Sequence, residues 1–143
     1  MSFTEQQCKT LLDVAKASIQ HGLAQRSPLT VNPLDYPSQL GEVRASFVTL
    51  KIHHNLRGCM GTIVAFRPLV SDVAYHAHAA AFSDPRFSPL QPPEVPDLDI
   101  HISVLSVPEP IYFNSEDDLI RQLRPGQDGL IIQEGIHRGT FLP

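Results

Sequence analysis

Residues 45–64, ASFVTLKIHHNLRGCMGTIV, hold the pattern that decides the fold. The first part, residues 45–52, is rich in β-branched and aromatic side chains with partial alternation, which is typical of a strand. Residues 53–55 then predict a turn in which Asn55 takes a positive φ. Residues 56–64 return as the partner strand, so the whole stretch predicts a β-hairpin.

Helical periodicity occurs on both sides of this hairpin. Thr4 and Gln7 form a capping box, and apolar residues at i, i+3 and i+4 spacing follow as far as Gly22. Because glycine accepts the left-handed conformation, we expect this helix to stop there. A second, alanine-rich helix is predicted from Pro68 to residues 83–85, where a proline ends it.

The rest of the chain predicts a strand, a short helix and a second hairpin. Residues 99–107 alternate between apolar and polar side chains, and a helix capped by Ser115 runs to Leu123. Residues 129–133 and 137–142 are typical of a hairpin. This order is not a regular βαβ alternation. It predicts an α+β fold with a mixed, largely antiparallel sheet and about three helices packed on it.

Length and composition limit the class of protein. The chain has 143 residues, which predicts one domain over residues 1–143. No apolar run approaches the roughly 18 residues of a membrane span, and no secretory signal precedes the first helix. We therefore expect a cytoplasmic protein, in which Cys8 and Cys59 are free thiols. A net charge of -4 makes nucleic acid an unexpected partner.

Cys59 is the first candidate for chemistry. It lies between Gly58 and Gly61, and no acidic residue occurs between Glu42 and Asp72. The basic side chains of that span are Arg44, Lys51, Arg57 and Arg67. Such surroundings favour a thiolate, which is a nucleophile or ligand. The alternative interpretation is a small buried hydrophobic residue, the common role of a free cysteine.

The neighbouring arginines and glycines are candidates for binding. Glycines leave the backbone open to close approach, and the planar fork of Arg57 suits a carboxylate or phosphate. The alternative for Arg57 is a salt bridge, for instance with Asp84 or Glu109. Arg86 fits a structural role as a tie between a proline-rich loop and the body. The candidate substrate-binding set is Arg57, Gly58, Gly61 and Arg86.

Histidines supply candidate bases but no metal site. His76 and His101 are the candidates to act with Cys59, which makes the catalytic set Cys59, His76 and His101. Asp72 and His76 are four residues apart, so the carboxylate can orient the imidazole, or the two form a surface helix pair. His76 and His78 point about 200° apart on a helix and cannot share one metal ion. No metal is expected, and no cofactor motif is present.

Five motifs in order resemble a known family. Leu56-Arg57-Gly58-Cys59-Met60-Gly61-Thr62 resembles the hallmark of AMMECR-type domains, which in many prokaryotes are called protein A of the AmmeMemoRadiSam system. The other four motifs are DPRFSPL at residues 84–90, ISVLS with PE at 102–109, PGQDGL at 125–130 and GTFLP at 139–143.

This resemblance implies an α+β fold with a cleft near the Arg-Gly-Cys motif and an activity that is not established. It also implies two partners, a Memo-type protein and a radical-SAM protein, whose genes often lie beside those of the family. The chain departs from the family at His53-His54, where relatives commonly have glycine, and at His76, where they have asparagine or tyrosine. It also ends at Pro143, so we expect the C-terminal segment of the relatives to be absent.

Two functions remain open on this basis. The first is a binding or assembly component that docks the Memo-type or radical-SAM protein at the Arg-Gly-Cys cleft. The second is an enzyme in which Cys59 attacks a small anionic substrate held by Arg57, with His76 or His101 as base.

Overall fold

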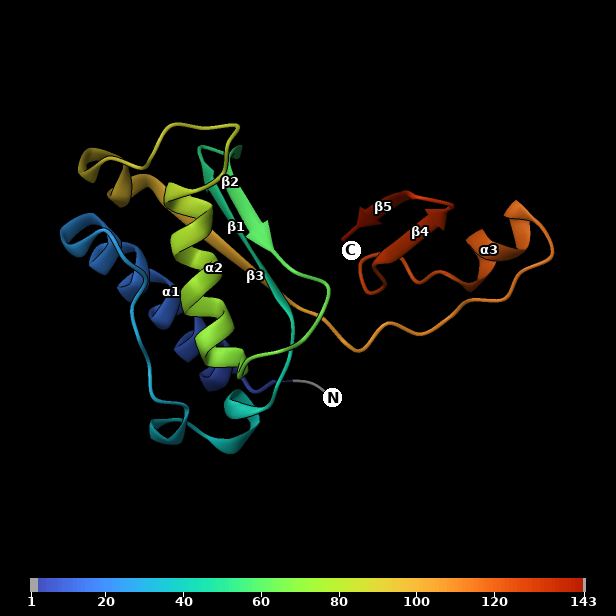
Figure 1. Ribbon diagram of the computed structural model, residues 1–143, viewed down its shortest axis with the longest axis horizontal. Helices are drawn as coiled ribbons and strands as arrows, with labels where there is room; N and C mark the ends of the chain where they lie inside the picture. Colours follow the sequence, from blue (N-terminus) through green and yellow to red (C-terminus); the bar gives the residue numbers. More distant parts are fainter. Residues whose placement is uncertain (1–2, 143) are drawn as a thin grey trace. The chain divides into compact units, whose positions relative to one another are not determined.

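The computed structural model describes residues 3–142 (Figure 1). The chain divides into two compact units, and the division falls between Val107 and Pro108. The expectation of a single domain over residues 1–143 stays a prediction.

The first unit contains a three-stranded antiparallel sheet. Its strands are β1 (Ser46–Ile52), β2 (Asn55–Gly61) and β3 (Leu98–Val104), in the order β2-β1-β3. The predicted hairpin is therefore confirmed, although β2 stops at Gly61 rather than at residue 64. Antiparallel pairing throughout agrees with the predicted α+β class.

The turn of this hairpin differs from the prediction. His53 and His54 take positive φ values of 50° and 68°, whereas Asn55 is already the first residue of β2. Positive φ at both central residues is typical of a type I′ two-residue connection, whose twist matches that of the flanking strands. The prediction for Asn55 was therefore wrong by one position.

Two helices accompany the sheet. Helix α1 (Glu5–Gln25) has the predicted Thr4–Gln7 capping box, but it ends at Arg26, with φ 58°, and not at Gly22. A Cβ at Gly22 would lie 2.5 Å from the ring of Phe82 on helix α2 (Leu69–Phe82). Gly22 therefore serves the close approach of the two helices instead of ending one.

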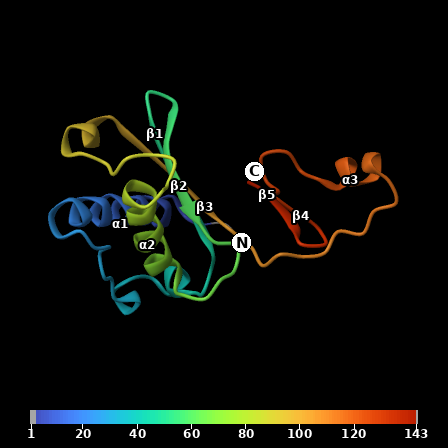
Figure 2. The ribbon, with the colours of Figure 1, turned by 45° about the horizontal axis from the view of Figure 1, so that its top comes forward.

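Both helices lie on one side of the sheet (Figures 1 and 2). Helix α2 packs on β1 and β2, and α1 packs on α2 and β3. Val48 and Leu50 of β1 point into this layer and are fully buried, so Thr49 between them faces the opposite side. The largest fully buried apolar side chains are Ile19, Leu40, Leu50, Leu69, Leu90, Val48, Val70 and Val73.

The second unit holds the predicted short helix and second hairpin. Helix α3 (Glu116–Gln122) is capped by Ser115, whose Oγ accepts the backbone N–H of Asp118. Strands β4 (Leu130–Glu134) and β5 (His137–Phe141) pair antiparallel. Two of the three predicted helices thus form the layer on the three-stranded sheet, and the third belongs to this unit.

Among residues 3–142, no helix has the length and apolar character needed to span a membrane.

Candidate functional site

The Cys59 backbone is held at the free edge of the sheet. β2 is an edge strand, and the backbone N–H of Cys59 donates to Asp84 Oδ2 at 3.0 Å. The carboxylate therefore takes the position that the carbonyl of a further strand would occupy. This contact joins the Arg-Gly-Cys motif to the Asp84-Pro85-Arg86-Phe87 motif, which lies 25 residues further along the chain.

Asp84 is fixed in turn by Arg86. The guanidinium donates from Nε to Oδ1 at 3.0 Å and from Nη2 to Oδ2 at 2.8 Å, and the Arg86 backbone N–H also donates to Oδ1. The hydrogen bonds from Arg86, with a smaller contribution from the Cys59 N–H, hold the pKa of Asp84 well below its usual range, although burial acts in the opposite direction. These contacts fit the structural role predicted for Arg86.

Arg57 fastens the proline-rich loop to the same edge. Its Nε and Nη2 donate to the two carboxylate oxygens of Glu94 at 2.8 and 3.2 Å, and Nη2 also donates to the Ser88 carbonyl at 2.8 Å. The salt-bridge alternative is the one that the structure has, with Glu94 as the partner in place of Asp84 or Glu109. Because these contacts use one edge of the guanidinium, Arg57 Nη1 is buried without a hydrogen-bond partner among residues 3–142.

The two glycines accommodate neighbouring segments of the chain itself. A Cβ at Gly58 would overlap the carbonyl of Ala80 on α2, and one at Gly61 would overlap the Ser46 carbonyl and the Phe47 ring of β1. The predicted close approach to the backbone of these glycines is therefore made by α2 and β1 of the chain itself. Ligand binding at Gly58 and Gly61 stays a prediction.

Cys59 faces away from the helices in a row with two other side chains. Thr49 lies opposite Cys59 on one side and opposite His101 on the other. The Cys59 Sγ is 3.2 Å from Thr49 Oγ1, and His101 Nε2 is 3.1 Å from Asp99 Oδ2. Adjacent strands are about 4.8 Å apart, so His101 is two strands away from Cys59 and is separated from it by Thr49.

Arg86 is a cation that lies near Cys59, in addition to Lys51 of β1 on the same face. Its side chain is 57% exposed. The hydrogen bond to Asp84 raises the pKa of Arg86, and the neighbouring Cys59 adds a smaller contribution in the same direction. The sequence interpretation placed this charge on Arg44, Lys51, Arg57 and Arg67 and did not include Arg86 of the second motif; a reactive Cys59 stays a prediction.

His76 lies elsewhere. Its Nδ1 is 3.1 Å from Asp72 Oδ2, and the two side chains are only 3% and 1% exposed. Ser46 Oγ donates to the same oxygen at 2.5 Å, and Arg67 Nε lies 2.9 Å from Asp72 Oδ1 without hydrogen-bond alignment. The expected surface pair is therefore a buried network between sheet and helices. It is on the opposite side of the sheet from Cys59.

The sequence interpretation missed Thr49 and Glu94 and gave Asp84 no role at Cys59. Thr49 could have been placed beside Cys59 only with the hairpin register, and a bulge between Leu50 and Lys51 shifts that register. Asp84 had a signal, an acid beside an arginine in a proline-containing motif. Within residues 3–142, no three His, Cys, Asp or Glu side chains are grouped to hold a metal ion.

The fold and these two joined motifs define an α+β domain built around an arginine-glycine-cysteine edge strand. The family model AMMECR1 matches residues 12–143. The chain therefore belongs to the AMMECR1 family.

Relatives and a solved structure agree with this assignment. A Methanothermobacter thermautotrophicus protein is 39% identical over 135 residues, which cover 94% of this chain and 70% of that protein. The Saccharolobus solfataricus protein SSO0193 is 41% identical over 140 residues, which cover 94% of this chain and 61% of the relative. The crystal structure of the uncharacterized protein PH0010 from Pyrococcus horikoshii has a TM-score of 0.82 at 34% identity, over 93% of this chain and 67% of that one.

Proposed function

We propose that this chain is a cytoplasmic binding component that acts with a Memo-type and a radical-SAM protein through the surface around the Arg57-Gly58-Cys59 motif. The observation that supports this most is that polar groups of the motif are bound to two later segments of the chain. Arg57 is bound to Glu94 and Ser88, and Asp84 is bound to Arg86 and the Cys59 N–H. These contacts leave Arg57 Nη1 unpaired among residues 3–142, but they fix both side chains and so support a rigid surface, which lowers the ordering cost of binding.

The sheet face that carries Cys59 supplies the chemistry for such a contact. Phe47, Thr49 and Lys51 of β1 are half-exposed on that face, beside Cys59. An apolar, a hydroxyl and a charged group in one row resemble the mixed composition of a protein interface. We infer that a partner covers this row.

The experiment is a binding titration with purified Memo-type and radical-SAM proteins from the same organism. We expect a complex at micromolar concentration with at least one of them, and we expect Lys51→Glu to weaken it about tenfold through a reversed charge at the contact. Lys9→Glu on the exposed face of α1 is the matched control and should leave it unchanged. No complex with either protein at about 100 μM, a concentration well above the affinity of a specific interface, would refute the proposal.

A second function is favoured by one contact, the 3.2 Å approach of Cys59 Sγ to Thr49 Oγ1 beside the Arg86 charge. In this alternative, Cys59 is a thiolate nucleophile, Arg86 holds a small anionic substrate, and His101 exchanges a proton through Thr49. The test is the rate of Cys59 alkylation by iodoacetate and by iodoacetamide in a Cys8→Ala background. Preference for the anionic reagent, lost in Arg86→Gln, supports this alternative, and equal rates count against it.

A further inference from the structure

Helices α1 and α2 cross at a spacing that two contacts fix. Ser18 Oγ donates to the Ala74 carbonyl at 2.6 Å, and both residues are buried. One turn further along α1, an added Cβ at Gly22 would lie 2.7 Å from Cδ2 of His78, which is one turn further along α2. The contacts therefore advance together on the two helices, which run in the same direction (Figure 1).

Two histidines come to the same side of this crossing. His21 follows Ser18 by three residues on α1. His78 follows Ala74 by four residues on α2. At about 100° per residue, three residues fall about 60° short of a full turn and four residues pass it by about 40°. Because the facing helices run in the same direction, these opposite rotations turn both imidazoles to one side, at nearly the same height.

The charges of the two rings confirm that they are close. After burial, His21 is the second cause that lowers the pKa of His78 in the folded chain. The carboxylates that contact a histidine among residues 3–142 are Asp72 and Asp99, and their partners are other histidines. The ring of His78 is therefore neutral at pH 7, which is the form that binds a metal ion.

Each ring keeps a nitrogen lone pair available. His21 Nδ1 is 2.8 Å from the Ser27 carbonyl, and because a carbonyl only accepts, Nδ1 carries the proton and Nε2 is unprotonated. Histidines that bind metal commonly hold their other nitrogen on a carbonyl in this way. The ring of His78 packs against Phe82, with 4.9 Å between centroids, and has no hydrogen-bond partner within residues 3–142.

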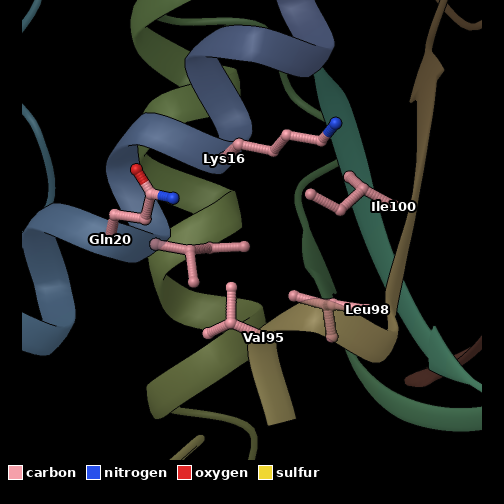
Figure 3. Close-up of a pocket in the computed structure, with 6 residues that line it drawn as sticks. Lys16, Gln20, Val95, Leu98 and Ile100 are labelled. Atoms are coloured by element: carbon pink, nitrogen blue, oxygen red, sulfur yellow. The ribbon is translucent and has the colours of Figure 1, made fainter. Parts of the chain in front are cut away.

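The β3 side of α1 offers no such pair of ligands. A cavity of about 70 Å³ lies there, between α1 and β3 (Figure 3). Its walls are four apolar side chains, one amide and one ammonium group, which belong to Lys16, Ile19, Gln20, Val95, Leu98 and Ile100. An ammonium group has no lone pair to give to a metal ion. The ligand chemistry of α1 is therefore on the side that faces α2.

We propose that His21 and His78 together bind one Zn²⁺ ion at the crossing of α1 and α2. Imidazole nitrogen is a common Zn²⁺ ligand, and helices that face one another often supply such sites. Water completes the tetrahedral coordination, because no third His, Cys, Asp or Glu is grouped with the two rings in the described part of the chain. The ion joins the last turns of α1 to α2. This site is on the helix side of the sheet, away from Cys59, and goes beyond the proposed function.

The first test follows the imidazole nitrogens by NMR while Zn²⁺ is added to the whole chain, at a pH of about 7.5 where neutral imidazole predominates. We expect the first equivalent to shift the ring signals of His21 and His78 together. His53 and His54, the exposed pair in the β1–β2 turn, serve as the internal control and should respond only later. Signals that move first at that turn, or at only one of the two helix histidines, would overturn the proposal.

Substitutions test the same ligands by affinity. His21→Asn and His78→Gln should each weaken Zn²⁺ binding by about tenfold or more, because losing a ligand costs at least as much as losing an outer partner. His54→Asn is the matched control and should bind Zn²⁺ as the unchanged chain does. Equal affinity in all three variants would contradict the site.

A pH series on the unchanged chain needs no substitution. Each ring has to lose its proton before it binds the ion, so well below both pKa values the Zn²⁺ affinity should fall by about a hundredfold per pH unit. A site with one histidine would lose only about tenfold per unit. That shallower slope would refute a shared ion.

Discussion

Two buried carboxylates, Asp72 and Asp84, hold the molecule together in different ways. Asp72, in the first turn of α2, accepts a hydrogen bond from Ser46 Oγ of β1, lies 3.1 Å from His76 Nδ1 and forms an ion pair with Arg67. Asp84 lies at the outer edge of β2 and accepts hydrogen bonds from the Arg86 guanidinium and from the backbone N–H groups of Cys59 and Arg86. The Asp72 network joins β1 to α2 in the core, and the Asp84 network holds the Arg57-Gly58-Cys59 motif at the edge of the sheet. Equal burial therefore does not mean equal function.

The largest effect is expected at Asp72. Asp72→Ala should lower the free energy of unfolding by about 3–5 kcal/mol, because it leaves several buried polar partners unpaired. Urea denaturation measures this directly. Asp13→Ala, at an exposed ion pair on α1, is the control and should cost less than about 1 kcal/mol. A similar small loss at Asp72 would remove the distinction between the two networks.

The second-largest effect is expected at Gly58, where the backbone of β2 approaches α2. Gly58→Ala should cost about 3 kcal/mol, because the new Cβ overlaps the Ala80 carbonyl and α2 has to move. Gly41→Ala is the matched control, since its Cβ would meet only the ordinary contact of Pro33 O at 3.8 Å. Thermal unfolding of both variants gives the comparison. Equal stability would mean that α2 does not pack as described.

A smaller effect is expected in the pH dependence of stability, to which Asp84 contributes. Its pKa is lowered in the folded chain, so as pH falls below about 4 the unfolded chain takes up this proton first. The stabilisation by Asp84 is therefore complete above that pH and is lost as pH falls toward the folded-state pKa. We expect urea midpoints of the unchanged chain to fall more steeply below pH 4 than those of Asp84→Asn. Parallel curves would contradict the pairing with Arg86.

The smallest effect concerns His78, where α2 meets α1. Burial, and then the neighbouring His21, lower the pKa of His78 in the folded chain. The unfolded chain therefore binds the proton first below about pH 6.5, and the contribution of neutral His78 to stability is lost as pH falls through that range. His78→Gln should flatten the stability profile between pH 7 and pH 5. An unchanged slope would exclude His78 as its source.

The sequence predicted the hairpin, the second hairpin and the helices because each has a local signal in periodicity or capping. Gly22 shows the limit of such signals, since glycine at a helix stop and glycine at a helix crossing look alike. The charge near Cys59 was predicted from basic residues close in sequence, yet Arg86, which interacts with the thiol, is 27 residues away. His76 was grouped with Cys59 because sequence spacing does not show on which side of a sheet a helix packs.

The most direct test of the difference between the networks is amide hydrogen exchange in Asp84→Asn and Asp72→Asn. We expect Asp84→Asn to speed exchange at the Cys59 amide by about tenfold or more and to leave Leu50 in the core unchanged, whereas Asp72→Asn should speed exchange at both. Exchange at Cys59 that is unaffected by Asp84→Asn, or that changes together with Leu50, would contradict it.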